Sequence, residues 1–264
     1  MTRFFIVLWI AMQTIAHSAQ AQEVVNRSDL FSVFAAENTT GTFVLIDVKN
    51  DRMTLVNKIR AYERFIPAST FKFANSLIAL ETQAISSVDE VIPYGGKPQI
   101  FKSWEKDMAL GEAFAASNVP VYQELARRVG LQNYTQWLAK LQYGNGAVGE
   151  AVERFWLDGP LTISAVEQAQ FMSALAQSAL PLSQNNQRIV QQIAHIETHD
   201  SSALQGKTGW TIAPDPDIGW FVGWVESEGA IYAFALNMDM AGRSDAPLRT
   251  ALARQFLQAL NVYK

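Results

Sequence analysis

Residues Gly219 to Met238, which read GWFVGWVESEGAIYAFALNM, carry the clearest structural signal in the chain. Two apolar runs, at 219–226 and 231–238, flank the turn-forming tetrapeptide ESEG, which is the pattern of two strands joined by a hairpin. Strands that are joined by so short a turn cannot be parallel. The C-terminal third therefore predicts antiparallel sheet, and a further strand-like segment at 204–212 extends it.

The rest of the chain adds two strand-like segments near the N-terminus and a long helical middle. The first segments lie at 41–48 and 53–57, and a turn at 49–51 separates them. Helical periodicity covers 69–81, 104–115, 121–129, 134–141, 164–176 and 185–194. A last helix is expected over 247–260, with Ser244 or Asp245 as its cap and Pro247 in its first turn. We therefore expect an α/β fold of layered α+β type: an antiparallel sheet built from N- and C-terminal strands, flanked by helices, with an inserted, mostly helical subdomain.

The composition excludes several classes of protein. The 264 residues are 49% hydrophobic and 17% charged, so the chain can bury a sizeable core and is not disordered. A net charge of −4 without a basic run argues against a nucleic-acid partner. There is no cysteine and there are only three histidines, so chemistry here must use mainly Ser, Lys, Tyr, Asp, Glu or Arg.

Residues 1–21 have the pattern of a secretory signal peptide. Arg3 supplies a positive charge, residues 4–12 are apolar, and Ala19-Gln20-Ala21 forms a small-x-small cleavage site. Nine apolar residues rise only about 14 Å as a helix, too little to cross a bilayer core of about 30 Å. No cysteine follows the site for a lipid anchor. We expect residues 22–264 to form one domain that is exported to a bacterial periplasm without a membrane anchor.

A candidate nucleophile lies at the start of the helix predicted over 69–81. Ser69-Thr-Phe-Lys72 has the spacing S-x-x-K, which places the hydroxyl and the amine on neighbouring ridges of a helix. The helix N-terminus favours developing negative charge, and an apolar surrounding disfavours the ammonium form of Lys72. The same spacing recurs at Ser103-Trp-Glu-Lys106, where charged neighbours indicate a solvated helix start with Ser103 as its cap. S-x-x-K alone therefore does not establish a catalytic site.

Three further segments follow Ser69 in order: Ser117-Asn-Val119, Tyr143-Gly-Asn145 and Lys207-Thr-Gly209. S-x-x-K followed by K-T-G is typical of penicillin-recognising serine enzymes. With S-x-V, Y-G-N and the segment Trp156-Leu-Asp-Gly159, the set resembles the class D, or oxacillinase-type, serine β-lactamases. The resemblance covers essentially the whole mature chain.

The resemblance implies hydrolysis of β-lactam antibiotics, and hence resistance, through an acyl-enzyme on Ser69. The Ser69 and Trp210 backbone N–H groups would form the oxyanion hole, and Ser117 would pass a proton to the leaving nitrogen. Residues expected to bind the substrate are Val119, Lys207, Thr208, Gly209, Trp210 and Arg249. Arg249 is expected to bind the substrate carboxylate, and Arg243 is the alternative candidate for this role.

The resemblance also implies that Lys72 is carbamylated by CO2 and then acts as the general base. Only a neutral amine adds CO2, so an apolar pocket around Lys72 favours this reaction. Val119 and Phe71 would supply the apolar wall, and the Trp156 indole N–H would donate to the carbamate. Class A relatives use a glutamate instead, but residues 155–162 contain none, and Asp158 is expected to be structural. No organic cofactor or metal is expected.

Three alternatives are open at this point. A penicillin-binding peptidase or transpeptidase would share Ser69, Lys72 and K-T-G but release β-lactams slowly, and a non-catalytic β-lactam sensor would bind them once. His195 and His199 could share a helix face, but their segment is not H-E-x-x-H and carries no evident third metal ligand.

Substrate range should depend on residues 98–106 and 211–218. The sequence leaves open whether the chain is a monomer or a homodimer.

Overall fold

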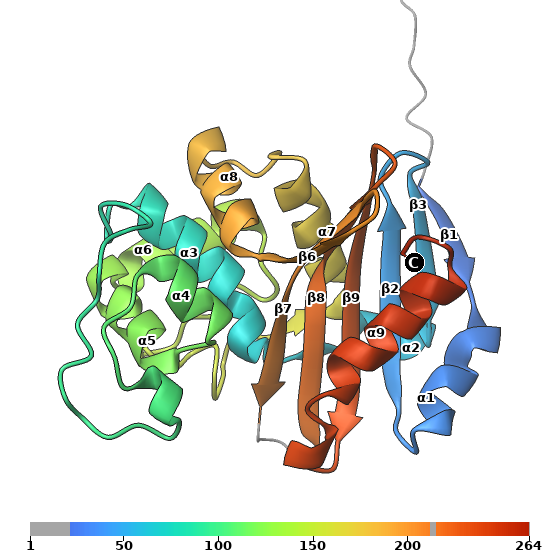
Figure 1. The fold of residues 1–264 in the computed structure, drawn as a ribbon, viewed down its shortest axis with the longest axis horizontal. Helices are drawn as coiled ribbons and strands as arrows, with labels where there is room; N and C mark the ends of the chain where they lie inside the picture. The colour runs from blue at the N-terminus through green and yellow to red at the C-terminus, as the bar shows by residue number, and fades with distance from the viewer. Residues whose placement is uncertain (1–21, 212–214, 264) are drawn as a thin grey trace, which may run out of the picture.

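The computed structural model describes residues 22–211 and 215–263. The expected signal peptide lies outside the described residues. Figure 1 shows a large sheet with helices on both faces and a helical part beside it, built from the middle of the chain. The expected architecture, a sheet made from both ends of the chain with a helical insertion, is confirmed.

Over the described residues, the main sheet has seven strands in the order β1-β3-β2-β9-β8-β7-β6. The strands are β1 (Glu23–Asn26), β2 (Gly41–Asp47), β3 (Arg52–Val56), β6 (His195–His199), β7 (Ser202–Thr211), β8 (Asp217–Ser227) and β9 (Ala230–Met240). β7, β8 and β9 are successive antiparallel neighbours, as the hairpin pattern predicts, and β2 pairs antiparallel with β9. The two ends of the chain thus meet at the centre of the sheet. β4 (Arg64–Phe65) and β5 (Ile163–Ser164) form a small second sheet.

The helices divide between the two faces of the sheet and the inserted part. They are α1 (Ser32–Ala36), α2 (Lys58–Tyr62), α3 (Lys72–Glu81), α4 (Leu110–Ala115), α5 (Val119–Val129), α6 (Leu131–Leu141), α7 (Ala165–Ala176), α8 (Gln184–Ile193) and α9 (Leu248–Ala259). α9 and α1 lie on one face, α7 lies on the other, and α3 to α6 form the helical part (Figure 1). In the described part of the chain, no helix combines the length and apolar character that a membrane span requires.

The sheet separates two hydrophobic cores because side chains along β8 alternate between its faces. Phe221 and Val225 point into the core under α9, whereas Trp220, Val222 and Trp224 point into the larger core shared with the helical part. Both faces of the central strands are therefore buried, which explains why 219–225 is apolar at nearly every position. The buried centre of the sheet lies directly beside the K-T-G segment of β7, which pairs with residues 220–222 of β8.

The prediction of a helix over 104–115 is wrong for the first half of that range. Lys102–Trp104 is a short 3-10 helix, and α4 begins only at Leu110. Between them Met108 pairs with Ile92 through two backbone hydrogen bonds, and this extended pairing interrupts the helix. Ser103 lies inside the 3-10 turn and is not a cap, contrary to the expectation.

Other differences from the expected elements lie at edges and termini. Ser244 and Asp245 do not cap α9: they belong to a 3-10 turn, and the Asp245 carboxylate accepts a hydrogen bond from Ala241 N. The segment His195–His199 is strand β6 and not a helix, because it pairs with β7. The sheet is also not wholly antiparallel, since β1 pairs parallel with β3.

Candidate active site

Ser69 and Lys72 meet at the junction of a 3-10 turn and a buried helix. Residues 68–71 form the 3-10 helix η2, and α3 begins at Lys72. Lys72 Nζ donates a hydrogen bond to Ser69 Oγ over 2.8 Å. Ala68 has a left-handed backbone (φ +48°), a conformation costly for a non-glycine residue and often found at functional sites. The S-x-x-K spacing has therefore brought the two groups into direct contact.

Lys72 is fully buried, with 0% of its surface exposed. Its Nζ lies 4.9 Å from the centroid of the Tyr122 ring, which comes from α5. Burial lowers the pKa of Lys72 well below its usual value, and the nearby positive charge of Lys207 lowers this pKa further. The lowered pKa favours the neutral form of the amine, which a base or a CO2 acceptor requires.

The K-T-G segment of β7 packs directly against the nucleophile turn. A Cβ at Gly209 would lie 2.9 Å from Pro67 O and 3.1 Å from the Thr70 side chain, so only glycine allows this approach. β6 ends its pairing with β7 at Gln205, and residues 206–211 of β7 lie beyond it. This part of the β7 edge faces the cleft that contains Ser69.

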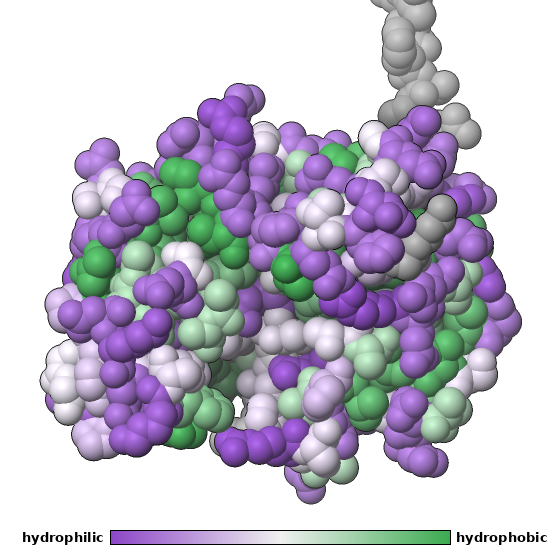
Figure 2. Space-filling model, in the orientation of Figure 1, coloured by the Kyte–Doolittle hydropathy of each residue, from purple (hydrophilic) through white to green (hydrophobic). Residues whose placement is uncertain are grey.

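A pocket of about 350 Å³ opens beside Ser69. It is lined by Ser69, Phe101, Ser103, Trp104, Ala116, Ser117, Val119, Thr208, Trp210 and Arg249. Six of these ten are residues that the sequence analysis assigned to the site. Figure 2 shows a hollow between the helical part and the sheet, at the end of β7. Lys207 lines an adjoining cavity of about 290 Å³, which shares Thr208 with the first.

Three basic side chains approach this region: Lys72, Lys207 and Arg249. Within residues 22–211 and 215–263, none of them forms an ion pair with a carboxylate. Lys207 Nζ donates to Thr208 O (3.2 Å), and Arg249 donates to Gly209 O (2.7 Å) and to Ala246 O (2.8 Å). Uncompensated positive charge in a cleft attracts an anionic ligand.

The structure separates the two candidate arginines. Arg249 lines the pocket with Ser69, and its guanidinium touches the K-T-G backbone at Gly209. Arg243 does not line this pocket; its guanidinium carbon lies 5.4 Å from the centroid of the Phe101 ring, at the pocket rim. Arg249 is therefore the better placed to meet a ligand beside Ser69.

Comparison with known proteins gives the family. Residues 32–258 match the penicillin binding protein transpeptidase domain. The chain is 36% identical over 255 residues to β-lactamase OXA-5 of Pseudomonas aeruginosa, covering 96% of each chain. It is 35% identical over 251 residues to β-lactamase OXA-48 of Klebsiella pneumoniae, covering 95% of each. The crystal structure of FUS-1 (OXA-85), a class D β-lactamase from Fusobacterium nucleatum subsp. polymorphum, superposes with a TM-score of 0.88 at 41% identity, covering 90% of this chain and 100% of that one.

The chain belongs to the class D β-lactamases. The family that the sequence motifs predicted is therefore confirmed, and members of this family are hydrolases.

Two motif residues of this class D β-lactamase lie on the wall opposite β7. Ser117 has a left-handed backbone (φ +53°) two residues before Val119, which begins α5. Asn118 between them is buried and accepts a hydrogen bond from Val121 N, which caps α5. In the described part of the chain, no hydrogen bond joins the Ser117 hydroxyl to Ser69 or Lys72. The proton-transfer role of Ser117 stays a prediction.

Trp156 lies in the core next to the nucleophile helix. It is fully buried and stacks on Phe71 with ring centroids 5.5 Å apart, so Phe71 lies beside the site as expected. Among the described residues, its indole Nε1 has no hydrogen-bond partner. Asp158, by contrast, is half exposed and forms an ion pair with Arg154, which agrees with the structural role expected for it.

Sequence reasoning missed three aromatic residues of this site. Tyr122 contacts Lys72, and Phe101 and Trp104 line the pocket. Tyr122 follows Val119 by three residues, a helical spacing that could have indicated a shared face. Phe101 and Trp104 fall within the segment 98–106 that was expected to shape substrate range, but no local pattern predicts where their side chains lie.

We expect Arg249→Ala to raise KM for carboxylate-bearing β-lactams by roughly 10- to 100-fold, since a charge-assisted hydrogen bond contributes about 1.5–3 kcal/mol. Arg243→Ala is the matched control and should change KM less than about fivefold, because its exposed contact with Phe101 contributes about 0.5–1 kcal/mol. Steady-state kinetics on both variants test this. A larger effect from Arg243 would reverse the assignment.

Proposed function

We propose that this class D β-lactamase hydrolyses β-lactam antibiotics through an acyl-enzyme on Ser69, with Lys72 as the general base in its N-carboxylated form. The observation that carries the proposal is the 2.8 Å contact between Lys72 Nζ and Ser69 Oγ in a pocket walled by the K-T-G strand. Both chemical steps need a base within hydrogen-bond reach of the serine, and Lys72 is in that position. The relatives named as β-lactamases support the substrate class.

Acylation begins when Ser69 Oγ attacks the lactam carbonyl and the C–N bond of the ring breaks. The Lys72 side chain takes the hydroxyl proton, and Ser117, on the facing wall, passes a proton to the leaving nitrogen. The backbone N–H groups of Ser69 and Trp210 would stabilise the oxyanion; one such donor typically contributes about 10²–10³ in rate. The close approach of Gly209 to Pro67 supports this pairing, because it fixes β7 against the nucleophile turn.

The surroundings of Lys72 fit the proposed carboxylation. The buried amine has a lowered pKa, so a neutral form is available for CO2. Trp156 Nε1 is a buried donor without a partner among the described residues, and leaving such a group unpaired costs about 1–3 kcal/mol. When bound, CO2 would supply an anionic base with two acceptor oxygens. Val119, Tyr122 and Phe71 would keep bulk water from it.

Lys207 and Arg249 would hold the substrate carboxylate, and this gives a pH prediction. Burial and the charge of Arg249 lower the pKa of Lys207 to about 7. Lys207 must be protonated to bind an anion, so kcat/KM should fall as pH rises through about 7. Lys72 must lose its proton, so kcat/KM should also fall in acid.

The pH at which kcat/KM falls on the alkaline side tests whether protonated Lys207 binds the substrate carboxylate. Arg249→Ala removes one cause of the lowered pKa, so the alkaline midpoint should move to higher pH although the absolute rate falls. A pH profile of kcat/KM for wild type and Arg249→Ala measures both midpoints. An unmoved alkaline midpoint in the variant would contradict this account.

Steady-state hydrolysis of a chromogenic cephalosporin such as nitrocefin tests the proposed function. Many turnovers per protein molecule are expected. A burst of one equivalent followed by no further product would instead identify a penicillin-binding peptidase or a sensor module.

We further propose that the chain acts in the periplasm after cleavage behind Ala21; the sequence pattern of residues 1–21 supports this.

A further inference from the structure

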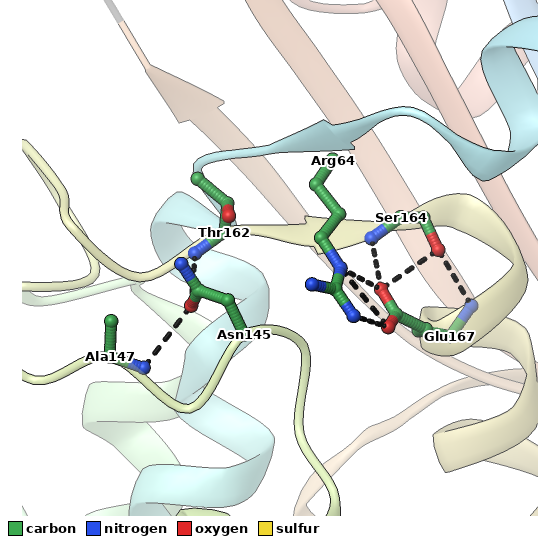
Figure 3. Close-up of polar contacts among 6 residues, drawn as sticks. All are labelled: Arg64, Asn145, Ala147, Thr162, Ser164 and Glu167. Atoms are coloured by element: carbon green, nitrogen blue, oxygen red, sulfur yellow. Dashed lines mark hydrogen bonds and ion pairs between the residues drawn. The ribbon is translucent and has the colours of Figure 1, made fainter.

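The Tyr143-Gly-Asn145 motif has no part in the mechanism above, yet one of its side chains makes an unusually complete set of contacts. Asn145 Oδ1 accepts hydrogen bonds from Thr162 N (3.0 Å) and Ala147 N (3.2 Å), and Nδ2 donates to Pro160 O (2.9 Å). Its backbone N–H also donates to Thr162 O (2.9 Å). Figure 3 shows Asn145 beside Thr162 and Ala147. Asn145 thus holds the end of the loop 155–162.

The other two residues of the motif fix its place between the loop and the nucleophile helix. A Cβ at Gly144, where φ is +55°, would lie 2.1 Å from Thr162 O, so the close approach requires glycine. The buried Tyr143 ring packs edge-on against Phe71, with centroids 5.5 Å apart. Phe71 directly precedes Lys72. The motif therefore touches the loop on one side and the Ser69–Lys72 segment on the other.

The loop that Asn145 holds carries Trp156. Leu161 N donates to Phe155 O over 3.1 Å, which closes the loop next to Thr162. Trp156 follows Phe155, and its ring stacks on Phe71. A chain of direct contacts thus runs from Asn145 through Thr162 and Leu161 to the residue before Trp156.

We propose that Asn145 is a positioning residue: by fixing the loop 155–162 it holds the Trp156 indole N–H at the buried site where an N-carboxylated Lys72 needs a donor. The inference rests on the proposed function for the identity of that acceptor. Groups that support a ligand-binding residue from behind typically change ligand affinity on the order of 10–100-fold when removed. Releasing the loop would let Trp156 turn toward water and let water reach Lys72.

Two variants of Asn145 and one control separate this role from a general loss of stability. Asn145→Ala removes all three side-chain hydrogen bonds, whereas Asn145→Asp keeps the acceptors and loses the donation to Pro160 O. Arg64→Gln is the control, because it removes an ion pair to Glu167 in the neighbouring β4–α7 region (Figure 3) without touching the loop. All three variants are compared at equal fractions folded.

The first measurement is the ¹³C NMR signal of carboxylated lysine as ¹³C-bicarbonate is titrated. We expect Asn145→Ala to raise the bicarbonate concentration for half-maximal signal on the order of 10-fold or more, by loss of the positioned donor. Asn145→Asp should lie between Asn145→Ala and wild type, and Arg64→Gln should match wild type. An unchanged midpoint in Asn145→Ala would overturn the inference.

The second measurement is hydrogen exchange at the Trp156 indole N–H in protein depleted of CO2, where no carboxylated lysine is present to protect it. Its ¹⁵N resonance is assigned from Trp156→Phe, and exchange should be faster in Asn145→Ala but unchanged in Arg64→Gln. Equal protection in Asn145→Ala and wild type would show that Asn145 does not position Trp156. If the indole responds but wild type gives no carboxylated-lysine signal, the base in the proposed function fails, while the positioning of Trp156 by Asn145 stands.

Discussion

Ser69→Ala is expected to abolish β-lactam turnover, lowering kcat on the order of 10⁵-fold or more, as removal of an enzymic nucleophile does. The hydroxyl is the only group of the Ser69–Lys72 pair that can form the ester intermediate, and Lys72 would then face a methyl group. Steady-state hydrolysis measures the loss. Mass spectrometry after incubation with a β-lactam should show no covalent adduct on the variant and a transient or trapped one on wild type.

The loss of turnover identifies Ser69 as the nucleophile only if the Ser69→Ala variant is correctly folded. Ser69 makes a side-chain hydrogen bond only with Lys72 among the described residues, so the thermal unfolding temperature of Ser69→Ala should stay close to that of wild type. A variant that folds normally and still turns over β-lactam at an appreciable rate would remove Ser69 from the mechanism.

Lys72→Ala is expected to have the second largest effect and a different kinetic form. Loss of a general base costs typically about 10²–10⁴-fold per step. Acylation should be slow but measurable, whereas deacylation should nearly stop, so the acyl-enzyme accumulates. A burst of at most one equivalent of product and a stable adduct mass are the expected observations.

The chain supplies its own matched control for this variant. Lys106 has the same S-x-x-K spacing from Ser103 but lies on the surface in an ion pair with Glu112. Lys106→Ala should therefore leave kcat and bicarbonate dependence unchanged. Rapid deacylation by Lys72→Ala would show that another group serves as the base.

The sequence predicted the sheet and the order of its parts well because the relevant signals are local. The hairpin over 219–238 needs only two apolar runs and a short turn between them. Ser69 and Lys72 likewise meet through helical spacing alone.

What the sequence did not predict depends on contacts between distant segments. The helix expected at 104–115 lost its first half to pairing of Met108 with Ile92, which nothing local to residue 104 reveals. The contact of Tyr122 with Lys72 arises from the packing of α5 on α3. The choice between Arg249 and Arg243 required the path of the chain after β9, where a 3-10 turn precedes α9.

The same limit applies to the Tyr143-Gly-Asn145 motif. Its sequence reads as a turn, and its four hydrogen bonds between Asn145 and the segment 147–162 appear only when the loop is folded back on it. The spacing of the motifs predicts which residues belong to the site, whereas the groups that these residues contact depend on tertiary packing.

In the proposed mechanism Lys72 serves as the base in both steps after reacting with CO2. The most direct test is steady-state hydrolysis of nitrocefin by wild-type protein depleted of CO2 at mildly acidic pH and then supplied with bicarbonate. Turnover should be low after depletion and should recover to the full rate on addition of bicarbonate, whereas Lys72→Ala should show no recovery. Full turnover of the depleted wild-type enzyme, unaffected by bicarbonate, would contradict the account.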